Sequence, residues 1–137
     1  MKRAFEIPPF FTFPAAVLAA HGIASTILNL YNHYPNADIP FHFIGGFSIT
    51  YTATQILAYL EKEEMIARLN GVVFLVLIVS LTAAATVFWE FAEFGADQLL
   101  RTNVQVSIAN IMQDQFMGIC GGVTWALIYA KKGLRLW

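Results

Sequence analysis

Four long segments of the chain are mostly apolar, and short polar stretches separate them. A helix needs about 20 mostly apolar residues to cross the hydrocarbon core of a bilayer. We therefore expect transmembrane helices at about residues 10–31, 41–60, 72–94 and 107–130. The first run is longer than the apolar part of a typical signal peptide, so we expect it to be retained. The pattern predicts an all-α integral membrane four-helix bundle that forms a single transmembrane domain over residues 1–137.

Polar and small residues within each expected helix recur on one face. When each residue turns the helix by about 100°, the polar positions of the third segment share one narrow arc, and the other segments behave similarly. A charged group that faces lipid is unfavourable by about 2.5–3.5 kcal/mol, so these faces should meet inside the bundle. The face of the first segment carries His21, Ser25, Asn29 and Asn32, and that of the second carries His42, Gly46, Thr50 and Thr54. The face of the third segment carries Thr82, Thr86, Glu90, Glu93 and Asp97, and that of the fourth carries Ser107, Asn110, Asp114, Gly118 and Gly121.

Many of these positions have an ordinary structural explanation. Serine, threonine and glycine on one face are typical of helix packing in membranes, and Gly118 and Gly122 have the GxxxG spacing. We interpret His21, near the middle of the membrane, as a hydrogen-bonded packing residue. Trp89, Trp125 and Trp137 are interpreted as interface and lipid-facing residues.

Composition supports a membrane protein and excludes a nucleic-acid-binding one. Hydrophobic residues make up 58% of the sequence, charged residues make up 12%, and the net charge of -1 offers no basic surface. Seven of the eight basic residues would lie on one side of the four spans and only Arg101 on the other; the seven are Lys2, Arg3, Lys62, Arg68, Lys131, Lys132 and Arg135. The positive-inside rule then predicts that both termini are cytoplasmic.

This topology places several acids at a similar depth near the outer side. Buried carboxylates without partners either take up protons or bind a cation. We expect His42, Glu90, Glu93 and Asp114 to form a site for a divalent metal ion such as Zn, Mn or Fe. Asp38, Asp97 and Asn110 are expected to position these ligands. The sequence lacks the Glu-x-x-His pairs of di-iron bundles and the HExxH of zinc proteases.

Three stretches together resemble a known group of proteins. DIPFHFIGGF from Asp38, FWEFAEF from Phe88 and NIMQDQFMGICGG from Asn110 are similar to the uncharacterised polytopic membrane family that includes YjdF. A weaker likeness is to VanZ-like proteins. Two positions depart from the family pattern, because Ile39 replaces a frequent lysine and Asn110 replaces an aspartate. The resemblance implies a membrane protein and brings no reaction with it.

The leading functional hypothesis is cation binding at the outer-leaflet site, for structure or for membrane-embedded catalysis on a lipid-like or envelope substrate. One alternative is an accessory subunit of a larger membrane complex, whose polar core is purely structural. A second alternative is a proton-linked small transporter, although the charges stop in the outer half of the expected bundle. The expected partners are the lipid bilayer and either further copies of the chain or a larger complex, and the expected location is the bacterial inner membrane.

Overall fold

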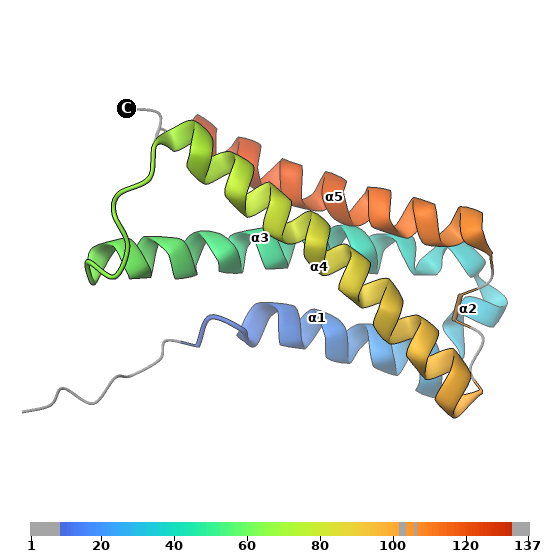
Figure 1. Ribbon diagram of the computed structural model, residues 1–137. Coiled ribbons are helices and arrows are strands. Elements are labelled where there is room, and N and C mark those ends of the chain that lie inside the picture. Colours follow the sequence, from blue (N-terminus) through green and yellow to red (C-terminus); the bar gives the residue numbers. More distant parts are fainter. Residues whose placement is uncertain (1–8, 102–103, 106, 133–137) are drawn as a thin grey trace, which may run out of the picture.

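The computed structural model describes residues 9–101, 104–105 and 107–132, without the side chains of Asn32, Pro35 and Leu100. These residues form helices joined by short connections, with no strand among them, so the all-α fold is confirmed (Figure 1). In chain order the elements are α1 (Thr12–Gly22), the π-helical turn η1 (Ile23–Ile27), α2 (Leu30–His33), the 3-10 turn η2 (Pro35–Ala37), α3 (Ile39–Lys62), α4 (Gly71–Leu100) and α5 (Ile108–Lys131).

The first expected span is interrupted, which corrects the continuous helix predicted over residues 10–31. Its helical part, Thr12–Ile27, ends in the π-helical turn η1, and Asn29 then adopts a left-handed conformation with φ of 50°. Asparagine tolerates this conformation better than most residues because its short polar side chain can bond locally. The chain therefore turns at Asn29 and starts the separate short helix α2.

The three long helices differ in polarity. Among the described helices, Gly71–Leu99 of α4 is long and apolar enough by itself to cross a bilayer. α3 and α5 each contain 24 residues, which at 1.5 Å per residue is about 36 Å and exceeds a hydrocarbon core of about 30 Å. Both are less apolar because they carry many of the polar positions that the structure buries. The four-span topology stays a prediction.

Glycines allow α3 and α5 to pack with their backbones in contact. A Cβ atom added to Gly46 would lie 1.8 Å from the carbonyl oxygen of Gly118, and one added to Gly121 would lie 1.9 Å from that of Phe43. No side chain fits at these distances. The small-residue packing predicted for Gly118 and its neighbours is confirmed.

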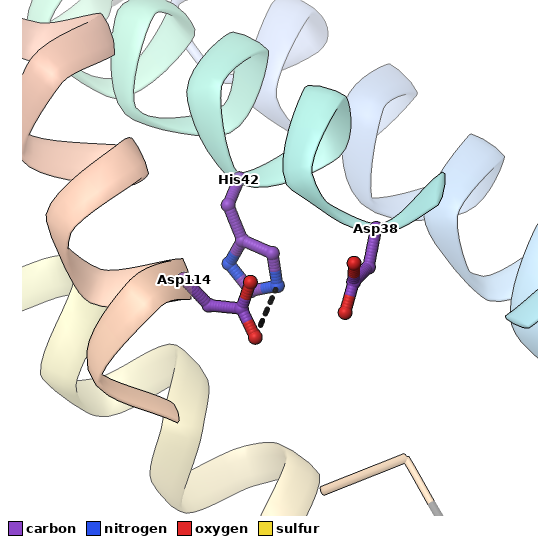
Figure 2. A group of neighbouring side chains, drawn as sticks. All are labelled: Asp38, His42 and Asp114. Atoms are coloured by element: carbon purple, nitrogen blue, oxygen red, sulfur yellow. Dashed lines mark ion pairs between the residues drawn. The ribbon is translucent and has the colours of Figure 1, made fainter. Parts of the chain in front are cut away.

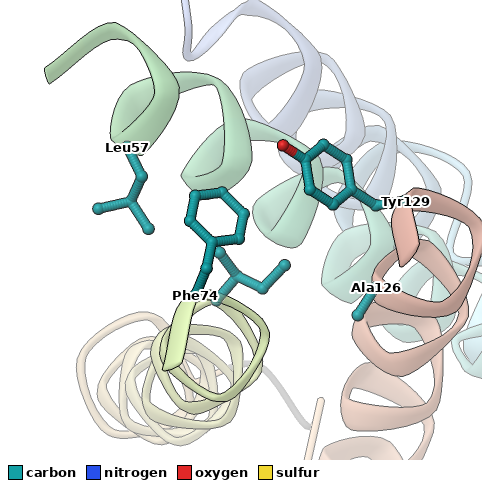
Figure 3. Packing of buried hydrophobic residues seen from close by; sticks show 5 residues of the cluster. Leu57, Phe74, Ala126 and Tyr129 are labelled. Carbon is teal, nitrogen blue, oxygen red and sulfur yellow. The ribbon is translucent and has the colours of Figure 1, made fainter. Parts of the chain in front are cut away.

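A hydrophobic core fills the end of the bundle where α3 and α5 finish. Leu57, Phe74, Ala126 and Tyr129 pack together there (Figure 3), and Ile78 belongs to the same cluster. Trp125 packs against this cluster and its Nε1 donates a hydrogen bond to Thr54 Oγ1 at 3.1 Å. Trp125 is half-buried, so part of its ring packs inside the bundle, and its expected position at the membrane interface stays a prediction.

Basic residues gather beyond this hydrophobic core. Lys62 ends α3, Lys131 ends α5 and Lys132 follows it, while Arg101 follows α4 at the opposite end of the bundle. Lys2, Arg3 and Arg135, which contribute to the expected orientation, lie outside the described residues, as does Trp137. The described charges fit the expected orientation, and the sidedness stays a prediction.

The helices are not packed equally. α3 contacts α1, α4 and α5, whereas α1 makes no close backbone contact with α4 or α5 in the described parts of the chain. Figure 1 shows α4 crossing the bundle obliquely in front of α3. α1 is therefore attached to the bundle mainly through α3.

Candidate metal centre

Four of the residues singled out from the sequence meet at the end of the bundle opposite the hydrophobic core. His42 lies in the first turn of α3, Glu90 and Glu93 near the end of α4, and Asp114 in the second turn of α5. All four are buried, with Asp114 only 2% exposed. The amphipathic stripes predicted this convergence, because one face of each helix turns toward the others.

His42 is at the centre of the group. Its Nδ1 lies 3.9 Å from Glu90 Oε1, and its Nε2 lies 3.9 Å from both Glu93 Oε1 and Asp114 Oδ2. These distances are too long for hydrogen bonds. Two ligands bound to one tetrahedral zinc ion at 2.0–2.1 Å are about 3.4 Å apart, so the spacing around Nε2, with Glu93 and Asp114, is close to that of a metal site, whereas Glu90 lies beside the other ring nitrogen.

Asp38 lies closer to the ligand atoms than the sequence suggested. It was expected to position a ligand, whereas its carboxylate, His42 and Asp114 offer ligand atoms within 4.8 Å of one another (Figure 2). His42, Glu90 and Glu93 form a second such group. The imidazole is common to both groups.

Three carboxylate oxygens in this site are buried without a hydrogen-bond partner. They are Asp38 Oδ1 from the residue preceding α3, Glu90 Oε1 from α4 and Asp114 Oδ1 from α5. Burial of an unpaired charged group is strongly unfavourable, so such oxygens require a proton or a cation. His33 and Arg101 are exposed, and the nearest basic group to any of these oxygens is His42, whose Nδ1 lies 3.9 Å from Glu90 Oε1.

His21 belongs to the site, although the sequence placed it in the packing of the membrane interior. Its Nε2 lies 3.1 Å from Glu93 Oε1, and its Nδ1 is 2.8 Å from the Tyr31 hydroxyl. The interruption at Asn29 makes this possible, because it folds Tyr31 back toward α1. His21 was expected to form a packing hydrogen bond, and the contact with Glu93 was not predicted.

Trp89 also contacts the site, and its interpretation as a lipid-facing residue was wrong. Its Nε1 donates a hydrogen bond of 2.8 Å to Glu93 Oε1, and its ring packs edge-on against both His21 and His42. Trp89 and Glu93 are four residues apart, a spacing that places side chains together on a helix surface. That spacing was the available signal in the sequence.

Val104 and Gln105, which lie between α4 and α5, are held against the site by Asp97 and Glu90. The two oxygens of Asp97 accept the backbone N–H groups of Val104 and Gln105, both at 2.9 Å. Gln105 Nε2 then donates to the Glu90 backbone oxygen at 2.8 Å and to Glu90 Oε2 at 3.2 Å. Asp97 thus holds the segment that carries Gln105, a residue that the sequence reading missed.

Asn110 has a more direct role than Asp97. Its Nδ2 donates a hydrogen bond of 3.3 Å to Asp38 Oδ2. An amide at this position therefore holds one oxygen of Asp38 and leaves the other oxygen, Oδ1, without a partner. Asn110 was expected to position His42 or Asp114, and in the structure it positions Asp38.

Threonines on α3 and α4 pack beneath the site. Thr82 Oγ1 and Thr50 Oγ1 form a hydrogen bond between the two helices, as expected for a polar packing face. Thr86 instead donates to the Ala83 carbonyl oxygen of its own helix. These residues contribute packing and offer no group to the site above.

The comparisons with known proteins identify a family. The model of the family described as "Predicted membrane protein (DUF2238)" matches residues 1–133. An uncharacterized protein of Thermotoga maritima is 32% identical over 114 residues, which cover 82% of this chain and 57% of that protein. The chain thus spans a little over half the length of this relative. No solved structure matches the chain.

Proposed function

Because this chain belongs to the DUF2238 family of predicted membrane proteins, we propose that it binds a divalent cation inside the bilayer, at the site around His42. Membership of this family confirms the resemblance of the chain to an uncharacterised membrane family. It also implies that the chain associates with the lipid bilayer. We further propose four spans in a bacterial inner membrane, with the site near the outer surface. The cation would be held by His42 together with carboxylates of the two groups that share it, Asp38 with Asp114 and Glu90 with Glu93.

The three unpaired carboxylate oxygens carry this proposal. They come from three parts of the chain, and the residues that carry them lie around one imidazole. A cation would satisfy these oxygens, whereas plain helix packing does not require them. Imidazole and carboxylate ligands together suit Zn, Mn and Fe. His21, Trp89, Gln105 and Asn110 would hold the ligands in place, as residues behind metal ligands commonly do.

A cation in this position would be able to support chemistry on a molecule in the outer leaflet. A bound metal ion supplies a Lewis acid and lowers the pKa of a coordinated water. Membrane-embedded catalysis on a lipid-like or envelope substrate is the activity that this chemistry favours. Assembly into a homo-oligomer or a larger membrane complex is compatible with the same site.

Elemental analysis of the purified protein tests the proposal. We expect about one metal ion per chain in wild type after incubation with Zn, Mn or Fe salts, and at least a ten-fold loss in the Asp114→Asn and His42→Gln variants. Glu63→Gln is the matched control, because Glu63 is an exposed carboxylate after α3, far along the chain from the site. Folding of each variant is checked by its melting temperature in detergent.

Absence of bound metal in wild type under all three conditions would overturn the proposal. The carboxylates would then carry protons. Co-purification of a stoichiometric protein partner would favour an accessory subunit, and proton-coupled uptake into vesicles would favour a transporter.

A further inference from the structure

A groove opens between α1 and α4, next to the candidate metal centre. It has a volume of about 390 Å³, which lies within the range of about 300–1,000 Å³ typical of small-molecule sites. Leu18 of α1 and Phe88 of α4 line it, together with three alanines of α4, Ala85, Ala92 and Ala96. The groove exists because α1 has no close backbone contact with α4 and because alanines leave space between them.

The polar groups that line the groove are concentrated at the metal centre. His21 and Glu93, which contact each other at 3.1 Å, both line it. Ser25 and Thr26 also line it, but their hydroxyls donate to the Gly22 carbonyl oxygen of their own helix. A ligand in the groove would therefore meet apolar walls and one polar pair.

A second apolar groove continues along the same side of α1. It has a volume of about 310 Å³ and is lined by Phe11, which precedes α1, by Pro14 of α1, by Leu81 of α4 and by residues of α3. Ala85 lines both grooves. From Leu81 to Ala96, α4 rises about 22 Å, so the two grooves follow a large part of the bilayer depth.

The dimensions favour a hydrocarbon chain over a protein helix as the occupant. A helix with side chains is about 10–12 Å wide, so a volume of 390 Å³ would enclose roughly 5 Å of its length, about one turn. A hydrocarbon chain is far thinner and is abundant around a member of a membrane protein family. An apolar wall with a polar pair at one end matches the shape and polarity of an amphiphile.

The charge of the side chains at the polar end of the groove determines which head groups an amphiphile can have there. Glu93 is accompanied by the carboxylates of Glu90, Asp114 and Asp38, while His21 and His42 are the only basic side chains buried among the described residues. An anionic head group would be repelled by this surplus of acids when no cation is bound. An amine or a hydroxyl can donate hydrogen bonds to a carboxylate.

We propose that this groove binds the hydrocarbon chain of a membrane amphiphile, which enters sideways from the bilayer between α1 and α4, and that His21 and Glu93 hold its amine or hydroxyl head group. The inference names a ligand for the site described above. Binding of this ligand does not depend on the proposed function, because the groove and the polar pair do not require a bound cation. Only a reaction of the ligand at the site rests on that proposed function.

Photolabelling with a long-chain alkyl amine that carries a diazirine tests the inference. The chelator-treated protein is placed in phosphatidylcholine nanodiscs, and labelled peptides are identified by mass spectrometry. We expect labels in α1 and α4, and at least a five-fold reduction in Ala85→Phe and Ala92→Phe, which fill the groove. Ala84→Phe is the matched control, because Ala84 is exposed, neighbours Ala85 and does not line either groove.

Ala92 is exposed within the groove, so its substitution leaves the helix packing intact and remains informative if Ala85→Phe fails to fold. Equal labelling in wild type, Ala92→Phe and Ala84→Phe would overturn the inference, as would labels confined to α5. Unlabelled alkyl amine should compete at a concentration at least ten-fold lower than an alkyl phosphate of equal length. Equal or better competition by the phosphate would overturn the head-group assignment.

Metal content, measured on samples of the same variants that were not treated with chelator, separates the two proposals. Ala92→Phe should lose the label and keep the metal of untreated wild-type protein. Wild type that takes the label in α1 and α4 but never binds metal would support the groove and contradict the metal site. Wild type that binds metal and takes no label would support the metal site and contradict the groove.

Discussion

His21 Nε2 lies 3.1 Å from Glu93 Oε1, and this pair joins α1 to α4, two helices without close backbone contact in the described parts of the chain. Hydrogen bonds between helices in membranes contribute about 0.6 kcal/mol on average and up to about 1.7 kcal/mol. The pair therefore fastens α1 weakly at the edge of the groove.

Removing the imidazole should loosen α1 without unfolding the bundle. We expect His21→Leu to lower the free energy of unfolding in detergent by about 1 kcal/mol and to raise hydrogen exchange in α1 more than in α5. Tyr31→Phe is the control, because it removes the hydroxyl that contacts His21 Nδ1 and keeps the contact with Glu93. A larger effect of Tyr31→Phe than of His21→Leu would contradict this account.

Glu93 and Asp114 should behave as one unit in metal binding. Glu93→Gln and Asp114→Asn each keep the side-chain volume and remove a charge, so we expect folded proteins that have lost bound metal. The double variant should be little worse than either single variant, because residues that share one ligand are not additive. Titration of metal into the four proteins measures this, and independent losses that add up would show that the two carboxylates bind separately.

Asn110 offers a test in the opposite direction. Asn110→Asp removes the amide that donates to Asp38 Oδ2 and adds a further carboxylate to the site. We expect the metal-free protein to be less stable by about 1–3 kcal/mol, since like charges are brought together without a donor. Metal should restore the stability and bind more tightly than in wild type. A variant with unchanged melting temperatures, with and without metal, would place Asn110 outside the site.

The contact between α3 and α5 predicts a sharp difference between adjacent glycines. Gly46→Ala places a Cβ atom 1.8 Å from the Gly118 carbonyl oxygen, so the helices must separate. We expect a loss of at least about 3 kcal/mol in the free energy of unfolding, at or beyond the upper end of typical overpacking. Gly45→Ala meets nothing within 4 Å and should be neutral or stabilising by up to about 1 kcal/mol. Similar stabilities of the two variants would refute the close packing.

The expected orientation is tested by labelling in intact cells. In a Cys120→Ser background, Asn36→Cys should react with a membrane-impermeant maleimide from outside. Glu63→Cys, an exposed position at the end of α3, should react only after permeabilisation. The reverse pattern would invert the topology and place the candidate metal centre on the cytoplasmic side.

The sequence predicted the helical class and the meeting of the charged residues for the same physical reason. Charges in lipid are unfavourable, so the faces that carry His42, Glu90, Glu93 and Asp114 had to turn inward, and each face is defined by the helical period. Their similar depth followed from counting residues along each helix. Both predictions assume only that each segment is a regular helix.

The same assumption explains what the sequence reading missed. His21 was placed by treating residues 10–31 as one straight helix, whereas the π-helical turn and the left-handed Asn29 change the path of the chain. Gln105 lies in an irregular connection held by Asp97, where no period applies. Trp89 lies four residues before Glu93, a spacing that allowed the contact but did not require it, and its ring packs inward against His21 and His42.

Every long element of the bundle contributes at least one side chain to the site: His21 from α1, His42 from α3, Glu90 and Glu93 from α4, and Asp114 from α5. A ligand that contacts all of them can bind only after the whole bundle has assembled, so its binding energy is added to the stability of the native state. At a concentration one hundred times its dissociation constant, such a ligand contributes about 2.7 kcal/mol. Ligand availability would then set the lifetime of the protein in the membrane, and unliganded copies would be the first to be cleared by quality-control proteases.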